Sequence, residues 1–189
     1  MHDNGAVYRI GVVGDTHVPD RKLSLPEIFY SRLQQHSPDL IFHTGDITSP
    51  QMIRSLEKIA PVIAVRGNRD QFLMSYLPLV KHIEVKGVWI TLLHGHAGFW
   101  RYLWSKIRIL ISGYHLKWFL PQLVEAGEGS DVIIFGHSHH PVNEMYGQQL
   151  LFNPGSPCVP MNSGGKLSFG LLNIFEDNTV KGEIVPLES

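Results

Sequence analysis

The 189-residue sequence contains a single cysteine, Cys158, which excludes an internal disulfide framework. It also lacks a charge excess, because 16 basic residues face 17 acidic ones, for a formal net charge of -1 at pH 7. Without a basic track, neither a nucleic-acid partner nor a nuclease function is expected. The sequence has no apolar run of about 18 residues, which predicts no transmembrane span. No secretory signal is visible either, and we therefore expect a cytoplasmic protein.

Hydrophobic residues are plentiful, at 43% of the chain against 17% charged, which is typical of a globular protein. There are no internal repeats and no low-complexity linker, so we expect residues 1–189 to form a single domain. Eleven residues are histidines, and several are close together in the sequence, notably His94 with His96 and His137 with His139. Histidine is the commonest metal ligand in proteins, so this clustering indicates a metal site.

Short apolar runs, several of them ending at glycine, predict buried strands. The first three alternate with helical patterns at residues 23–35 and 52–59, an order that is typical of parallel βαβ units and an α/β fold. A later pair of strands, separated by Lys86 and Gly87, predicts a hairpin. The expected strands are residues 8–14, 40–43, 62–65, 83–85, 88–93, 132–135, 149–152, 167–174 and 180–185.

Polar side chains follow the ends of these predicted strands. Ligands of α/β proteins gather at the carboxyl ends of strands, so residues more than 120 positions apart can converge there. One residue separates Asp15 from His17 and His137 from His139, so the two side chains of each pair are expected on one side of an extended backbone. Carboxylate, amide and imidazole groups without a thiolate suit Mn, Fe, Zn, Ni or Co. The candidate ligands are Asp15, His17, Asp46, Asn68, His94, His137 and His139.

These residues lie in short motifs rich in glycine. The motifs are GDTH at 14–17, GD at 45–46, GNRD at 67–70, HGH at 94–96 and GHSH at 136–139. In this order they resemble the motifs of the calcineurin-like metallophosphoesterase superfamily. The short chain and the NPGS run at 153–156 resemble its small single-domain branch of Vps29-like phosphodiesterases.

The resemblance implies a four-layer α/β/β/α sandwich with two mixed sheets. It also implies a phosphodiesterase or phosphatase in which two divalent cations, with Mn²⁺ favoured, activate a hydroxide that attacks phosphorus. Asp46 would bridge the two ions. One ion would be held by Asp15, His17, Asp46 and His139, and the other by Asp46, Asn68, His94 and His137.

Arg69 departs from the family pattern, because the corresponding position often carries a histidine that is thought to protonate the leaving group. An arginine stays protonated and cannot act as an ordinary general acid, but it can grip a phosphate oxygen. We therefore expect Arg69, together with Asn68, to bind substrate, and Asp70 to orient Arg69. His96 or a water molecule would supply the proton.

Residues 99–120 form a second departure, a predicted helical insertion with three of the four tryptophans, four basic residues and no acidic residue. It can be a buried or homodimer-forming helix, a cap that recognises a lipid-like phosphoester, or a helix that contacts a membrane surface. A last alternative concerns the whole protein, which can be a scaffold for protein partners that has kept the fold. All seven candidate positions hold competent ligands, which favours an enzyme acting on a small or lipid-like phosphoester.

Overall fold

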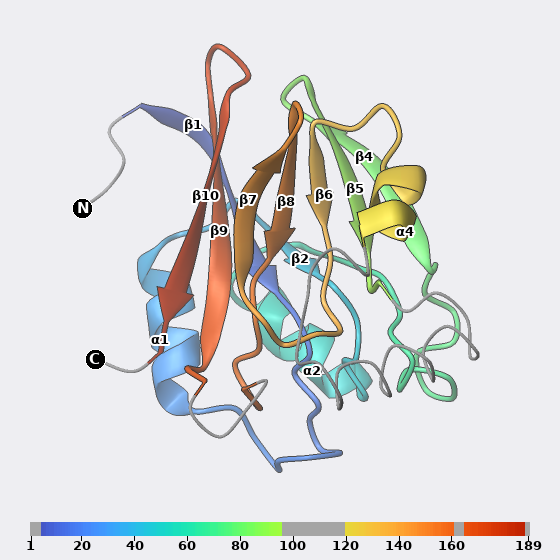
Figure 1. Ribbon diagram of the computed structural model, residues 1–189. Helices are drawn as coiled ribbons and strands as arrows, with labels where there is room; N and C mark the ends of the chain where they lie inside the picture. The colour runs from blue at the N-terminus through green and yellow to red at the C-terminus, as the bar shows by residue number, and fades with distance from the viewer. Residues whose placement is uncertain (1–4, 96–119, 161–164, 188–189) are drawn as a thin grey trace.

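The computed structural model describes residues 5–95, 120–160 and 165–187. Ten strands of this part of the chain form two five-stranded sheets (Figure 1). In the first sheet, with the order β10-β9-β1-β2-β3, the three strands β1, β2 and β3 run parallel, and β9 and β10 are antiparallel to their neighbours. These strands are β1 (Ala6–Val13), β2 (Leu40–His43), β3 (Val62–Ala64), β9 (Ser168–Phe175) and β10 (Val180–Pro186).

The second sheet has the order β4-β5-β6-β8-β7. Its three inner strands are parallel, and β4 and β7 pair antiparallel at the two edges. Both sheets are therefore mixed, as expected. The strands are β4 (Val80–Val85), β5 (Val88–Leu93), β6 (Val132–Ile134), β7 (Val142–Tyr146) and β8 (Gln149–Asn153).

Three apolar cores separate four layers. The alternation of side chains along β1 puts Ile10 and Val12 into the core between the two sheets, and Val13 into the core under α1 (Glu27–Gln35) and α2 (Pro50–Glu57). On the far side of the second sheet, Ile133 packs in a third core beneath α4 (Leu120–Ala126). The helices thus cover the outer faces of the two sheets (Figure 1), which confirms the predicted α/β/β/α sandwich.

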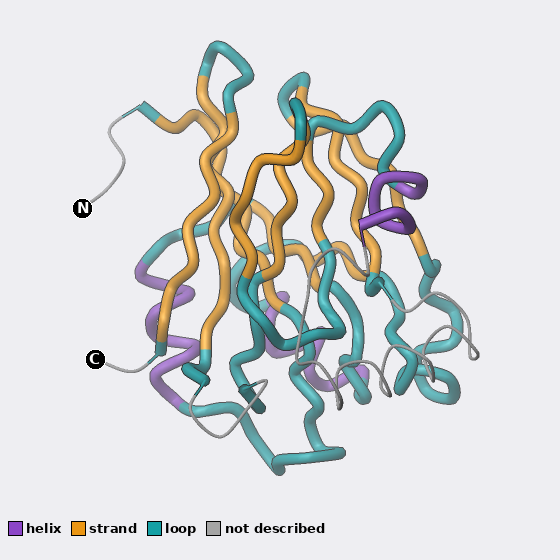
Figure 2. Tube along the Cα trace, viewed as in Figure 1, coloured by secondary structure: helices purple, strands orange, loops and turns teal. Residues whose placement is uncertain are grey.

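The register of the strands determines where the loops that carry the candidate ligands lie. Val13 of β1 pairs with His43 of β2, and His43 with Ala64 of β3, so these three strands end level with one another. In the second sheet, Leu92 of β5 pairs with Ile134 of β6, and Ile134 pairs with Phe152 of β8. The loops that follow these ends gather at one end of the molecule, at the bottom in Figure 2.

The predicted insertion at residues 99–120 lies outside the described residues, apart from Leu120 at the start of α4. Among the described helices, none is long and apolar enough to cross a membrane.

Candidate metal centre

The backbone of the candidate ligands is unusual. Five of them have a positive φ, in the left-handed region that residues with a β-carbon rarely adopt. Such a conformation costs on the order of 1–3 kcal/mol for each residue and persists only where the surrounding structure imposes it. The five are Asp15 (53°), His17 (49°), Asp46 (52°), His137 (69°) and His139 (56°).

Hydrogen bonds between the loops hold this geometry. The amide of Asp15 donates to the carbonyl of Gly45 at 3.1 Å, and that of His17 to the carbonyl of Asp46 at 3.0 Å. The amide of His137 donates to Asp15 Oδ2 at 2.9 Å. The Asp15–His17 and His137–His139 pairs were expected on one side of an extended backbone. This expectation was wrong, because all four residues have a positive φ just beyond the strand ends.

A first group of donor atoms surrounds His17. Its Nε2 atom lies 3.2 Å from His139 Nε2 and 3.6 Å from Asp46 Oδ2. His139 Nε2 in turn lies 3.5 Å from Asp15 Oδ1. The structure thus brings together the four residues expected at one metal ion.

A second group surrounds Asn68. Its Oδ1 atom lies 3.2 Å from His94 Nε2 and 3.1 Å from His137 Nδ1, and these two nitrogens are 3.3 Å apart. His94 Nε2 is also 3.5 Å from Asp46 Oδ1. The four residues expected at the other ion therefore also converge.

Asp46 joins the two groups, because its Oδ2 faces His17 and its Oδ1 faces His94. This is the arrangement required of a carboxylate that bridges two cations. Asp15 also lies near both groups, since its Oδ1 is 4.0 Å from His94 Nε2 but closer to His139.

The donor atoms fit divalent metal ions. Ligand atoms about 2.1 Å from an ion lie about 3.0–3.4 Å from their neighbours in octahedral or tetrahedral geometry, close to the separations seen here. Asp15 is 0% exposed, and its Oδ1 has no hydrogen-bond partner among the described residues. A buried carboxylate oxygen without a hydrogen bond is costly, and a cation would offset that cost.

Burial and neighbouring charges set the protonation of the ligands. Desolvation by burial lowers the pKa of His17 to about 3, so its imidazole is neutral and able to bind metal at neutral pH. The pKa of Asp15 is lowered despite its burial, because His139, His94 and His17 face it. Burial raises the pKa of Asp46, against the effects of His94 and of the Arg69 amide. A cation would favour the ionised form of Asp46.

Backbone carbonyls orient two of the imidazoles. His94 Nδ1 donates to the carbonyl of Thr44 at 2.8 Å, and His139 Nδ1 donates to that of Val159 at 2.7 Å. In both rings the second nitrogen is thereby directed at the centre as an acceptor, the usual support of a metal-binding histidine. The buried His43 also supports this region, since its Nε2 lies within hydrogen-bond distance of Thr16 Oγ1, at 3.2 Å.

Close approach of the loops requires glycine at two positions. A β-carbon at Gly67 would overlap the carboxylate of Asp46. Gly45 has a φ of +103°, and a β-carbon there would lie 2.9 Å from His94 Nδ1. The Asp46 loop and the Asn68 loop can lie this close together only because both positions lack a side chain.

Asp70 has a different place from the one expected. It is 1% exposed, and its carboxylate accepts hydrogen bonds from the amides of Ile47 at 2.9 Å, Thr48 at 2.8 Å and Gly67 at 2.7 Å. It therefore fixes the loop that carries Asp46. The guanidinium of Arg69 is held by Asp20, through a 2.6 Å contact from Nη1 to Oδ2, and not by Asp70.

Residues 153–156 form hydrogen bonds with the loops that carry the candidate ligands. Asn153 Nδ2 donates to the carbonyl of Gly136 at 2.9 Å, and Ser156 Oγ donates to that of Asp15 at 2.8 Å. These residues support the loops of both halves of the site. His96, expected as a proton donor, lies outside the described residues.

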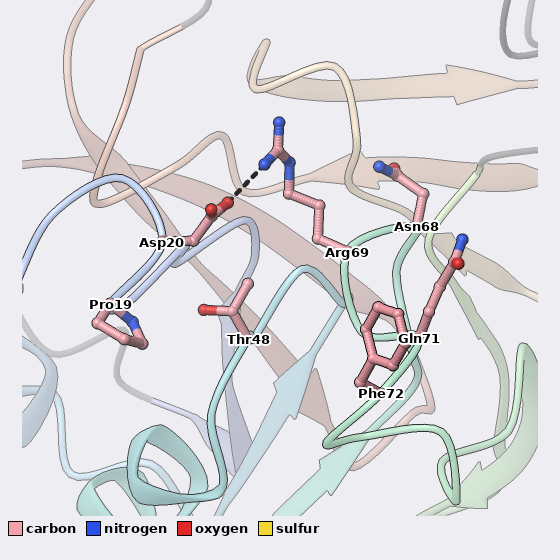
Figure 3. Close-up of a pocket in the computed structure, with 7 residues that line it drawn as sticks. All are labelled: Pro19, Asp20, Thr48, Asn68, Arg69, Gln71 and Phe72. Atoms are coloured by element: carbon pink, nitrogen blue, oxygen red, sulfur yellow. Dashed lines mark hydrogen bonds and ion pairs between the residues drawn. The ribbon is translucent and has the colours of Figure 1, made fainter.

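A surface cavity of about 410 Å³ opens beside the centre (Figure 3). It includes Asn68 and Arg69, the two residues expected to bind substrate, and it also includes residues that the motifs did not indicate. Its lining residues are Pro19, Asp20, Thr48, Asn68, Arg69, Gln71 and Phe72.

The sandwich fold and the seven converging candidate ligands are the arrangement expected of a metal-dependent hydrolase. Residues 8–177 match the calcineurin-like phosphoesterase superfamily domain, and the chain belongs to this family. It is 36% identical over 151 residues to a protein of Methanothermobacter thermautotrophicus named "Probable metallophosphoesterase", a match that covers 80% of this chain and 78% of the relative. It is also 34% identical over 138 residues to Phosphodiesterase YfcE of Escherichia coli, covering 73% and 66% of the two chains.

Among solved structures, the fold is similar to that of Vps29 from Entamoeba histolytica complexed with zinc. The TM-score is 0.64 at 25% sequence identity, and the match covers 95% of this chain and 99% of the other. Vacuolar Protein Sorting 29 from Cryptosporidium parvum has a TM-score of 0.72 at 18% identity, covering 96% and 98%. The chain is thus similar in sequence to named phosphoesterases and in fold to Vps29 proteins.

Proposed function

We propose that this protein hydrolyses phosphoesters with two divalent cations, bridged by Asp46. The observation that carries the proposal is the position of the Asp46 carboxylate, whose two oxygens face two separate groups of ligand atoms 3.5 Å and 3.6 Å away. Two such ions, when bound, would lower the pKa of water and offset the negative charge of the phosphate oxygens. Mn²⁺ is the favoured metal at both positions, and Fe, Zn, Ni and Co are alternatives.

The relatives support the reaction class, since the named ones are metallophosphoesterases and a phosphodiesterase. The zinc in the similar Vps29 structure supports a transition-metal site in this fold. The predicted location in the cytoplasm and a lipid-like substrate remain predictions, as do membrane or homodimer contacts through residues 99–120.

The protein's own groups would position the substrate. The amide of Arg69 donates to Asp46 Oδ1 at 2.9 Å, which ties the Arg69 loop to the bridging carboxylate. The Arg69 side chain is 40% exposed and reaches the cavity, where it can bond a phosphate oxygen. Its role is binding and charge stabilisation, with the leaving-group proton coming from His96 or water.

The similarity to Vps29 supports a second candidate, a scaffold for protein partners that binds metal but turns over no ester. Two observations favour hydrolysis. All seven ligand positions hold competent groups, and an open cavity adjoins the metal centre.

Hydrolysis of bis-p-nitrophenyl phosphate and of p-nitrophenyl phosphate tests the proposal. Chelator-stripped protein is assayed with and without Mn²⁺, beside Asp46→Asn and a surface control, Glu176→Gln. Turnover that needs metal, survives in Glu176→Gln and is lost in Asp46→Asn supports the hydrolase. If two ions bind and neither ester is cleaved, the scaffold is the better account.

A further inference from the structure

Asp20 is a cavity residue outside the metal motifs. Its carboxylate lies 2.6 Å from Arg69 Nη1, and Figure 3 shows the two side chains pointing at each other across the opening. The same Oδ2 atom is 3.8 Å from His17 Nδ1, a buried nitrogen with no hydrogen-bond partner among the described residues. Asp20 therefore stands between a metal ligand and the arginine expected to bind phosphate.

The pair changes the charge that a substrate meets. Arg69 alone would add one positive charge beside the metal centre and attract anions in proportion to their charge. Asp20 cancels that charge at short range and lines the same cavity with a carboxylate. A substrate with two phosphate charges gains less from such an opening than it would from a free guanidinium.

We propose that Asp20 is a specificity-determining residue, which by neutralising Arg69 makes the site discriminate against dianionic phosphomonoesters in favour of monoanionic phosphodiesters. The proposal rests on the hydrolase function above and adds the residue that sets its substrate charge. It also gives the cavity a role, which is to hold the uncharged substituent that a diester has and a monoester lacks.

Opposite substitutions in the pair give the sharpest test. Asp20→Asn keeps an oxygen that can accept from Arg69 but removes the negative charge, so kcat/KM for p-nitrophenyl phosphate is expected to rise about fivefold relative to the diester. Arg69→Gln removes the positive charge, and the same ratio is expected to fall by a similar factor. Asp20→Glu keeps the charge and is expected to retain the wild-type preference.

Glu176→Gln is the matched control for net charge. Glu176 follows β9, whose Phe175 pairs with Ala6 at the start of β1, so it lies at the end of the sheet opposite the metal centre. This substitution is expected to leave the ratio unchanged. Loosening of the loops would lower turnover of both esters together in Asp20→Asn and Arg69→Gln alike, and would not move the ratio in opposite directions.

Equilibrium binding provides a readout that does not depend on turnover. Calorimetry with Mn²⁺-loaded protein compares phenylphosphonate, a dianion at alkaline pH, with its monomethyl ester, a monoanion. Asp20→Asn is expected to tighten phenylphosphonate about fivefold more than the ester. Equal changes for both ligands, or monoester-to-diester ratios that move the same way in both variants, would overturn the role of Asp20. Absence of ester turnover in the wild type would instead count against the hydrolase function itself.

Discussion

The metal centre and the cavity beside it differ in how firmly their side chains are held. Asp46 and His94 are 3% and 1% exposed, whereas the side chains of Asp20 and Arg69 are 35% and 40% exposed. Backbone hydrogen bonds and buried carboxylates fix the metal loops, but a single ion pair defines the Asp20–Arg69 contact. Surface ion pairs of this kind contribute little to stability. The candidate metal centre is thus held by the fold itself, whereas substitutions of the cavity side chains are expected to cost little stability.

The largest effect is expected for substitution of Asp46, because its carboxylate faces both groups of candidate ligands. Asp46→Ala removes both carboxylate oxygens, so we expect a loss of about 10³-fold or more in kcat, comparable with the removal of a strong electrostatic contact. Metal stoichiometry by elemental analysis and turnover of the diester measure this. Near-normal activity with full metal loading would show that Asp46 is not shared.

Gly67→Ala is expected to be next, since a β-carbon at this position overlaps the Asp46 carboxylate. The two loops must separate, so metal affinity and turnover are expected to fall by roughly 10- to 100-fold, as for other disturbances behind metal ligands. The control is Gly147→Ala, which has a φ of +61° and no atom within 4 Å of the added carbon. This substitution introduces backbone strain but no steric overlap, so metal binding by the variant is expected to be unchanged.

Asp70→Asn separates structural support from catalysis. It replaces a buried carboxylate that accepts three backbone hydrogen bonds, so we expect a loss of about 2–3 kcal/mol in the free energy of unfolding of the metal-free protein. Denaturant unfolding measures it, beside the exposed Asp177→Asn, which is expected to cost much less. A wild-type unfolding curve combined with a large loss of turnover would contradict this structural role and indicate a direct catalytic role for Asp70.

The smallest effect is expected for Phe72→Ala on the cavity side. Phe72 is 89% exposed, so its loss is expected to change stability by less than about 0.5 kcal/mol and to leave metal binding intact. A moderate rise in KM for aryl esters, of about two- to fivefold, would reflect lost contact with the ring of the substrate. Loss of metal here would contradict the separation between centre and cavity.

The same contrast explains what the sequence could predict. Apolar runs predicted every strand except β7, whose sequence VNEMY has no apolar run and whose side chains are exposed after Val142. The largely exposed β4 was predicted only over residues 83–85 of its Val80–Val85 span. Helix α1 begins at Glu27 and not at residue 23, since Pro26 occupies the position before its first turn. α4 was not predicted either.

The seven candidate ligands could be named because each follows a strand end within a motif. Their backbone geometry could not be inferred, since the positive φ at Asp15 and His17 is held by hydrogen bonds to a loop that is distant in sequence. Asp20 has no motif, and its pairing with Arg69 spans 49 positions. Only the folded chain shows that contact. It also shows that Arg69 is paired with Asp20, whereas Asp70 was expected to orient it.

The most direct test of the account is electron paramagnetic resonance of the Mn²⁺-loaded protein, together with a count of bound ions. A carboxylate bridge through Asp46 predicts two ions per chain whose spins are exchange-coupled, and loss of that coupling in Asp46→Ala. One ion per chain, or two uncoupled ions in the wild type, would contradict a two-metal centre.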